Sequence, residues 1–80
     1  MMVAVRMKDG QIISGHSFHE IVRKMQEGGL LGIVPNRKYR KAVGRRVRYY
    51  NGMNIKVSHD EIFVRELRKI GEIGTILVTK

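Results

Sequence analysis

The sequence feature that most constrains the fold of this chain is an internal similarity at an offset of 42 residues. Without a gap, residues 5–38 pair with residues 47–80, and nine of the 34 pairs are identical, against about two expected from average residue usage. The identical pairs are Val5/Val47, Arg6/Arg48, Gly10/Gly52, Ile13/Ile55, Val22/Val64, Arg23/Arg65, Gly29/Gly71, Gly32/Gly74 and Lys38/Lys80. Because they fall at expected turns and core positions, the offset predicts that one supersecondary unit occurs twice.

Each half begins with a stretch that predicts a β-hairpin. In the first half, Val3, Val5 and Met7 alternate with polar or small residues, and residues 8–10 end in a glycine that suits a turn. The register then places Ile13 opposite Val5.

In the second half, apolar and polar residues alternate over residues 47–57, on both sides of an Asn-Gly pair. A three-residue loop over residues 50–52 keeps one face apolar and gives Gly52 the left-handed position that such a loop needs. This register places Tyr49 in the core and Tyr50 at the loop tip.

A helix is expected after each hairpin. Ser17 with Glu20, and Ser58 with Glu61, match the capping box, in which the two side chains satisfy free backbone amides at a helix start. Apolar residues at helical spacing follow each box. They are Phe18, Ile21, Val22 and Met25 in the first helix, and Phe63, Leu67 and Ile70 in the second.

Glycines at positions 28, 29 and 71 are expected to end these helices, and residues 30–34 and 73–78 are expected to form closing strands. The predicted fold class is therefore α+β, with two tandem β-β-α-β units over residues 3–34 and 45–79. A basic connection over residues 35–44 joins them within a single domain, residues 1–80. A ferredoxin-like sheet with an extra hairpin is the alternative.

Composition narrows the class of protein. The chain has 80 residues, of which 42% are hydrophobic, and it has no cysteine. Disulfides, thiolate nucleophiles and cysteine-based zinc sites are therefore excluded. No apolar run approaches the ~20 residues that span a membrane, and the N-terminal residues do not resemble a signal peptide. We expect a cytoplasmic protein without a membrane partner.

The positive charge is concentrated in one segment. The chain has 16 Lys and Arg residues against 7 Asp and Glu residues, a net charge of +9. Seven of the cations lie within residues 37–48, which contain no acid, so nine cations and seven acids, a net charge of +2, belong to the rest of the chain. These seven are Arg37, Lys38, Arg40, Lys41, Arg45, Arg46 and Arg48.

A short helix is expected at the start of this segment, capped by Asn36 and ending at Gly44. Its inner side would carry Tyr39, Ala42 and Val43. Its outer side would carry Arg37, Lys38, Arg40 and Lys41, continuous with Arg46 and Arg48 on the next strand.

This segment predicts a non-enzymatic nucleic-acid-binding domain, for DNA or RNA. Arginine binds phosphate oxygens bidentately, tyrosine stacks on bases, and faces that serve solubility alone usually mix both signs of charge. The candidate binding residues are Arg37, Lys38, Arg40, Lys41, Arg45, Arg46, Arg48 and Tyr50. The alternative is a protein-interaction module or small regulator that docks an acidic partner, and a homodimer is also open.

A small metal-dependent nuclease is a weaker alternative. His16 and His19 form an H-x-x-H pair, and His59 precedes Asp60 and Glu61. A zinc site needs three or four converging ligands, whereas these residues are explained by their places at helix starts. No metal site, cofactor or catalytic residue is therefore predicted.

Overall fold

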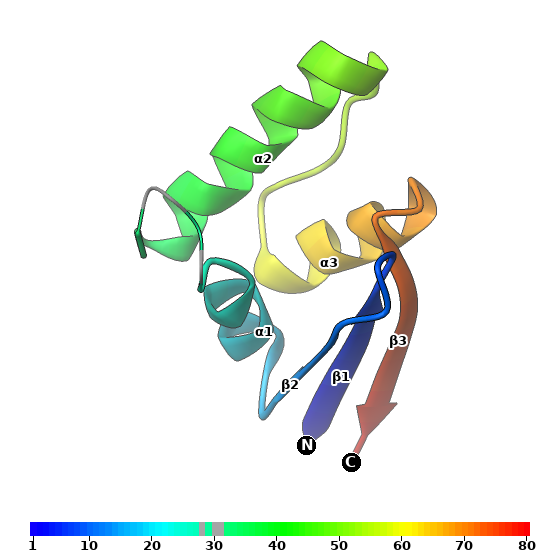
Figure 1. Ribbon diagram of the computed structural model, residues 1–80. Coiled ribbons are helices and arrows are strands. Elements are labelled where there is room, and N and C mark those ends of the chain that lie inside the picture. Colours follow the sequence, from blue (N-terminus) through cyan, green and yellow to red (C-terminus); the bar gives the residue numbers. More distant parts are fainter. Residues whose placement is uncertain (28, 30–31) are drawn as a thin grey trace.

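The computed structural model describes residues 1–27, 29 and 32–80 (Figure 1). Within them the chain forms a three-stranded antiparallel sheet and three helices, which confirms the α+β class. In chain order the elements are β1 (Met2–Met7), β2 (Ile12–Gly15), α1 (Phe18–Met25), α2 (Asn36–Asn51), α3 (Asp60–Lys69) and β3 (Ile73–Thr79).

The first hairpin is confirmed in its register. β1 and β2 pair antiparallel with Val5 opposite Ile13. The Met7 amide donates to the Gln11 carbonyl at 2.8 Å across the turn. Gly10 has a φ of +91°, in the left-handed region that favours glycine. Local turn chemistry and a period of two residues were enough to predict this element.

The sheet is completed from the far end of the chain. Its order is β2-β1-β3, and β3 pairs antiparallel with β1, so that Val3 lies opposite Val78. The predicted strand over residues 73–78 is thereby confirmed. The predicted strand over residues 30–34 is wrong for residues 32–34, which form no strand, and its first two residues lie outside the described part of the chain.

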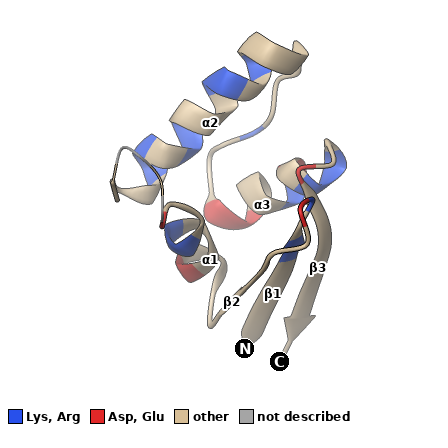
Figure 2. Ribbon diagram, in the orientation of Figure 1, with Lys and Arg blue, Asp and Glu red and all other residues tan. Residues whose placement is uncertain are grey.

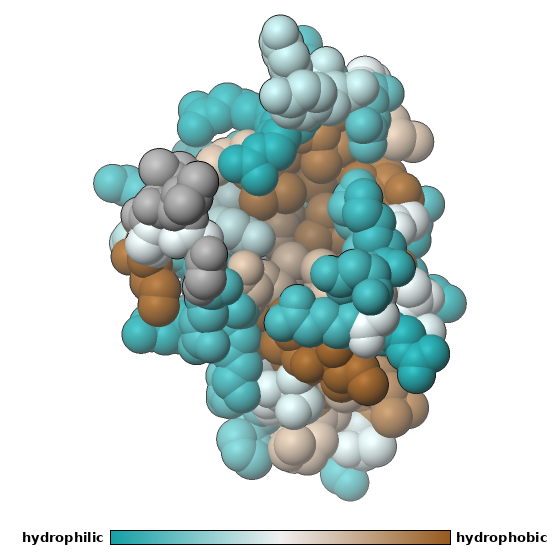
Figure 3. Space-filling model, viewed as in Figure 1, coloured by the Kyte–Doolittle hydropathy of each residue, from teal (hydrophilic) through white to brown (hydrophobic). Residues whose placement is uncertain are grey.

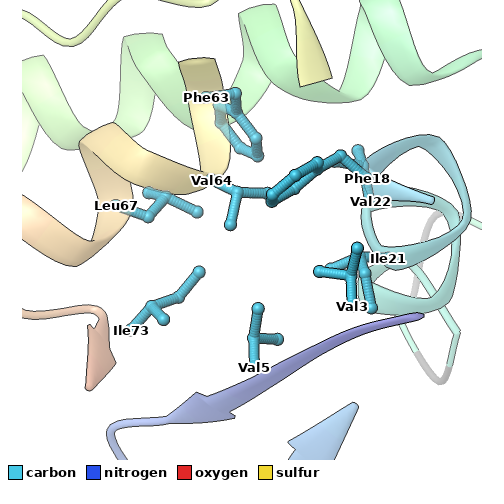
Figure 4. Packing of buried hydrophobic residues seen from close by; sticks show 9 residues of the cluster. All are labelled: Val3, Val5, Phe18, Ile21, Val22, Phe63, Val64, Leu67 and Ile73. Atoms are coloured by element: carbon cyan, nitrogen blue, oxygen red, sulfur yellow. The ribbon is translucent and has the colours of Figure 1, made fainter. Parts of the chain in front are cut away.

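The core lies between the sheet and the pair α1 and α3 (Figure 4). Successive residues of a strand point to opposite faces, so Val3 and Val5 of the central strand both point toward these helices. The buried side chains are Val3, Val5, Phe18, Ile21, Val22, Phe63, Val64, Leu67 and Ile73. The predicted helical stripes thus supply most of the core, although Met25 and Ile70 are only partly buried.

One of the two predicted capping boxes is half formed. The Glu20 amide donates to Ser17 Oγ at 3.1 Å, and the Glu20 carboxylate accepts from the amide of His16 rather than that of Ser17. The second box is wrong, because α3 begins one residue later than expected. Its N-cap is His59, whose side chain makes no capping hydrogen bond.

The prediction of a second hairpin is wrong, because residues 36–51 form the 16-residue helix α2. Tyr39, Val43 and Val47 recur every four residues; in the helix Tyr39 and Val43 pack on the core, and Val47 is buried. Gly52 does adopt a positive φ, +68°, as the hairpin required, but it does so as the C-cap, and its amide donates to the Arg48 carbonyl. The same glycine conformation therefore ends a helix.

The helix also continues past Gly44, where the shorter helix was expected to end. A Cβ at this position would lie 3.0 Å from Val57 Cγ1, so the missing side chain allows α2 to approach the segment that follows it. Consequently the described parts of the two halves have different structures, and they show no structural repeat. Nor do the described elements follow the β-α-β-β-α-β order of a ferredoxin-like sheet.

Candidate nucleic-acid interface

Helix α2 has one strongly basic face. At about 100° per residue, five of its cations fall within an arc of about 100°, and all five side chains are exposed. We call Arg37, Lys38, Lys41, Arg45 and Arg48 the basic face. Figure 2 shows Lys and Arg along several turns of α2 and no Asp or Glu on it.

The opposite side of α2 attaches it to the rest of the molecule. The helix packs on α1 and α3 and not on the sheet (Figure 1). The Tyr39 ring meets Phe63 edge to face, with centroids 6.1 Å apart and an angle of 75° between the ring planes. Val47 is buried one turn beyond Val43. This attachment makes the helix a third layer, with its basic face turned to solvent.

The acids of the chain do not neutralise the basic face. Five of the seven carboxylates form ion pairs with other residues, and none of the five cations of the basic face has an ion-pair partner among the described residues. The pairs are Lys8–Glu72, Lys24–Glu20, Arg65–Glu61, Lys69–Glu66 and Arg40–Asp60, and Asp60 also has His19 Nδ1 within hydrogen-bond distance. The positive potential is therefore concentrated on α2.

Arg40 does not project outward, so the prediction that it lies on the outer side of the helix is wrong. Its side chain is only 11% exposed and pairs with Asp60. Its Nε donates to the Val57 carbonyl at 2.8 Å, and its second terminal nitrogen donates to the Ser58 carbonyl at 3.4 Å. The reason is the rotation of the helix, which turns position 40 toward the segment before α3. Arg40 therefore joins α2 to that segment.

A cluster of polar side chains, of which Gln26 and Asn36 are buried, continues this attachment. Asn36 Nδ2 donates to the His19 carbonyl at 2.9 Å, and Gln26 Nε2 donates to Asn36 Oδ1 at 3.1 Å. We call His19, Gln26, Asn36, Arg40 and Asp60 the polar junction. It joins α1, α2 and the start of α3 by hydrogen bonds that require matched partners. Asn36 was expected to cap the helix, but the N-cap is Pro35, without a side-chain hydrogen bond.

The two adjacent tyrosines lie in the last turn of α2. Tyr49, expected in the core, is 82% exposed, and Tyr50, expected at a loop tip, is 75% exposed. Their rings meet edge to face at 5.0 Å. Tyr49 lies one turn beyond Arg45 and borders the basic face, whereas Tyr50 lies on the other side of the helix. Of the two, Tyr49 is the better placed to contact a ligand held on the basic face.

Arg46 lies apart from the basic face, at the edge of an apolar hollow of about 250 Å³ between α2 and the core. Tyr39, Val43, Tyr50 and Leu67 contribute to its lining. Figure 3 shows apolar residues in the recess between α2 and α3. Burial raises the pKa of the Tyr39 hydroxyl, and the nearby charge of Arg46 opposes this rise. Arg46 is therefore exposed, but it faces a different surface from the other cations.

The histidines and acids considered for metal binding come together only in part. His19 Nδ1 lies 3.3 Å from Asp60 Oδ2, so one histidine of the H-x-x-H pair does reach the start of α3. The same carboxylate group also pairs with Arg40. Within residues 1–27, 29 and 32–80, no three His, Asp or Glu side chains are grouped so that they could hold a metal ion.

Comparison with protein-family models, with curated proteins and with solved structures finds no match to the chain. Among the described helices, none combines the length and the hydropathy needed to cross a membrane.

Proposed function

We propose that this protein binds nucleic acid and that the basic face of α2 contacts the phosphate backbone. The observation that carries the proposal is the set of five exposed cations on one side of a single helix, without an acid to neutralise them. Arginine forks bind phosphate oxygens bidentately, and lysine adds a mobile point charge. Such a face gains affinity by releasing the counterions that surround nucleic acid.

The shape of α2 favours duplex DNA over duplex RNA. A helix of 16 residues is about 24 Å long, and the major groove of B-form DNA accepts an α-helix. The major groove of A-form RNA is too deep and narrow for this. Tyr49, at the border of the basic face, would lie beside the bound strand. We therefore expect tighter binding to duplex DNA than to duplex RNA of the same length.

The experiment is a salt titration of binding to duplex DNA, duplex RNA and single strands. If all five cations engage duplex DNA, the logarithm of the binding constant will fall with the logarithm of the salt concentration at a slope of about −4.5. Arg45→Gln should make the slope shallower by about 0.9. Arg68→Gln is the matched control, because Arg68 is an exposed cation on α3. Absence of binding at low salt would end the proposal.

An acidic protein partner is the second candidate, and the apolar hollow beside Arg46 favours it. Protein interfaces combine apolar contacts at their centre with charged residues at their rim. This hypothesis predicts that generic DNA does not displace the partner, and that Tyr50→Ser, at an exposed residue in the lining of the hollow, weakens binding. If the protein binds nucleic acid, generic DNA displaces the partner, and Tyr50→Ser leaves the DNA affinity unchanged.

A further inference from the structure

A second hollow lies between the first half of α2 and the segment that precedes α3. It has a volume of about 360 Å³ and is lined by Arg37, Arg40, Lys41, Lys56, Val57 and Ser58. Arg37 and Lys41 belong to the basic face, one turn apart, whereas Lys56 comes from outside the helix. No acid lines this hollow, and among the described residues these three cations have no ion-pair partner.

The walls of the hollow are held in place by contacts that do not use these three cations. Arg40 donates to the carbonyls of Val57 and Ser58. The Lys56 amide donates to the Glu66 carboxylate at 3.0 Å, which ties the backbone of this segment to α3. Because the two walls are already fixed, a ligand that enters between them loses little conformational freedom by ordering them.

The chemistry of the lining suits one phosphate group. Asp60 offsets the charge of Arg40, which leaves three cations around one hollow without an ion-pair partner among the described residues. Elsewhere on the basic face, a phosphate would meet cations of the helix alone. We propose that this hollow is a phosphate-binding site, in which one phosphate group of the bound nucleic acid lies between Lys56 and the α2 residues Arg37 and Lys41. This inference rests on the proposed function and extends the interface beyond α2.

The first test compares two single-charge variants in the DNA salt titration. Lys56→Gln should make the slope shallower by about 0.9 and lower the affinity roughly ten-fold at 0.1 M salt, while Arg68→Gln leaves both unchanged. Lys56 is exposed, so the variant should fold, and its circular dichroism and unfolding midpoint should match those of the wild type. If the wild type binds DNA and the two variants have the same salt slope and affinity, the phosphate-binding site is refuted and the proposed function stands. If the wild type binds no nucleic acid, the proposed function fails first.

The second test locates the phosphate directly. In an NMR titration of the full chain with inorganic phosphate, the amide signals of Arg37, Lys41, Lys56 and Ser58 should shift together and saturate, and Lys56→Gln should abolish the saturation. Shifts that grow without saturation, or that spread evenly over α2, would overturn the inference.

Nucleic acid has phosphate groups both in its backbone and at its ends. The DNA titration is therefore repeated with two forms of the same duplex, one with 5′-phosphate ends and one with 5′-hydroxyl ends. If Lys56→Gln lowers the affinity equally for the two duplexes, the site binds a backbone phosphate. If Lys56→Gln lowers the affinity only for the 5′-phosphorylated duplex, the site binds a terminal phosphate.

Discussion

Replacing Arg40 by glutamine should destabilise the fold, whereas replacing Lys41, its neighbour in sequence, should weaken nucleic-acid binding and leave stability unchanged. The two residues are adjacent cations that the sequence alone does not distinguish. In the structure the Arg40 side chain is largely buried in the polar junction, and the Lys41 side chain is exposed on the basic face. The pair therefore tests the rotation of α2 directly.

The magnitude for Arg40 follows from its three contacts. Hydrogen bonds to a charged group contribute about 1.5–3 kcal/mol, and removing one partner of a fully buried ion pair costs about 3–5 kcal/mol. Here the Arg40 and Asp60 side chains are 11% and 17% exposed, and Asp60 keeps Asn36 and His19 as neighbours. We therefore expect Arg40→Gln to lower the free energy of unfolding by about 2–3 kcal/mol.

This is a large fraction of the stability of such a domain, which is about 4–12 kcal/mol for a chain of this length. The midpoint of thermal unfolding should fall by about 10–20 °C. Lys41→Gln should change the free energy of unfolding by less than about 0.5 kcal/mol and make the salt slope of DNA binding shallower by about 0.9. Urea unfolding and the DNA titration measure both quantities on each variant. The opposite pattern, a stable Arg40→Gln with a shallower slope and a destabilised Lys41→Gln, would refute the orientation of the helix.

Three further substitutions test other parts of the structure. Gly52→Ala, at a φ of +68°, should lower the free energy of unfolding in urea by about 1–2 kcal/mol; an unchanged value would mean that α2 does not end there. Because burial raises the pKa of Tyr39, stability present below pH 10 is lost as the pH rises through the raised value. The difference in tyrosinate absorbance between the wild type and Tyr39→Phe reports the ionisation of Tyr39, and its midpoint should lie above 10.0, the ordinary pKa. A midpoint below 10.0 would contradict the burial of Tyr39. The pKa of Glu66 is lowered chiefly by the Lys56 amide, so its stabilisation is present at neutral pH and is lost as the pH falls below 4.5. Glu66→Gln should flatten the acid limb of the stability curve, and an unaltered limb would argue against this contact.

The elements that the sequence predicted correctly are those whose signals are local and unambiguous. The turn over residues 8–10 fixes the register of Val5 with Ile13, and the spacing of Phe63, Leu67 and Ile70 allows only a helix. Position 52 is different. A left-handed glycine after an asparagine suits both a hairpin loop and a helix end, so local chemistry permits either structure. The burial of Val47 beside the core decides for the helix, and burial depends on parts of the chain far away in the sequence.

The error over Arg40 has the same origin. The segment was identified correctly as the most basic part of the chain, but a list of cations does not give their directions. Once residues 36–51 are helical, a rotation of about 100° per residue divides the cations into groups. Five form the basic face, Arg40 turns inward, and Arg46 faces the apolar hollow. Lys56 lies outside the segment and was missed, because only the folded chain brings it beside Arg37 and Lys41.

The separation of these cations onto different sides of α2 changes the number that can contact one polyanion, and the salt slope of DNA binding measures this number. Seven cations acting together on duplex DNA would give a salt slope of about −6, whereas the basic face alone gives about −4.5, and the addition of Lys56 gives about −5.4. Reaching the steepest value through the original seven would require Arg40 to leave Asp60 and two backbone carbonyls. Binding would then break the attachment of α2, and the cost of breaking these contacts would reduce the binding affinity. A steep slope in a complex whose NMR spectrum keeps the signals of the Arg40 contacts would therefore mean that the extra contacts come from elsewhere on the chain.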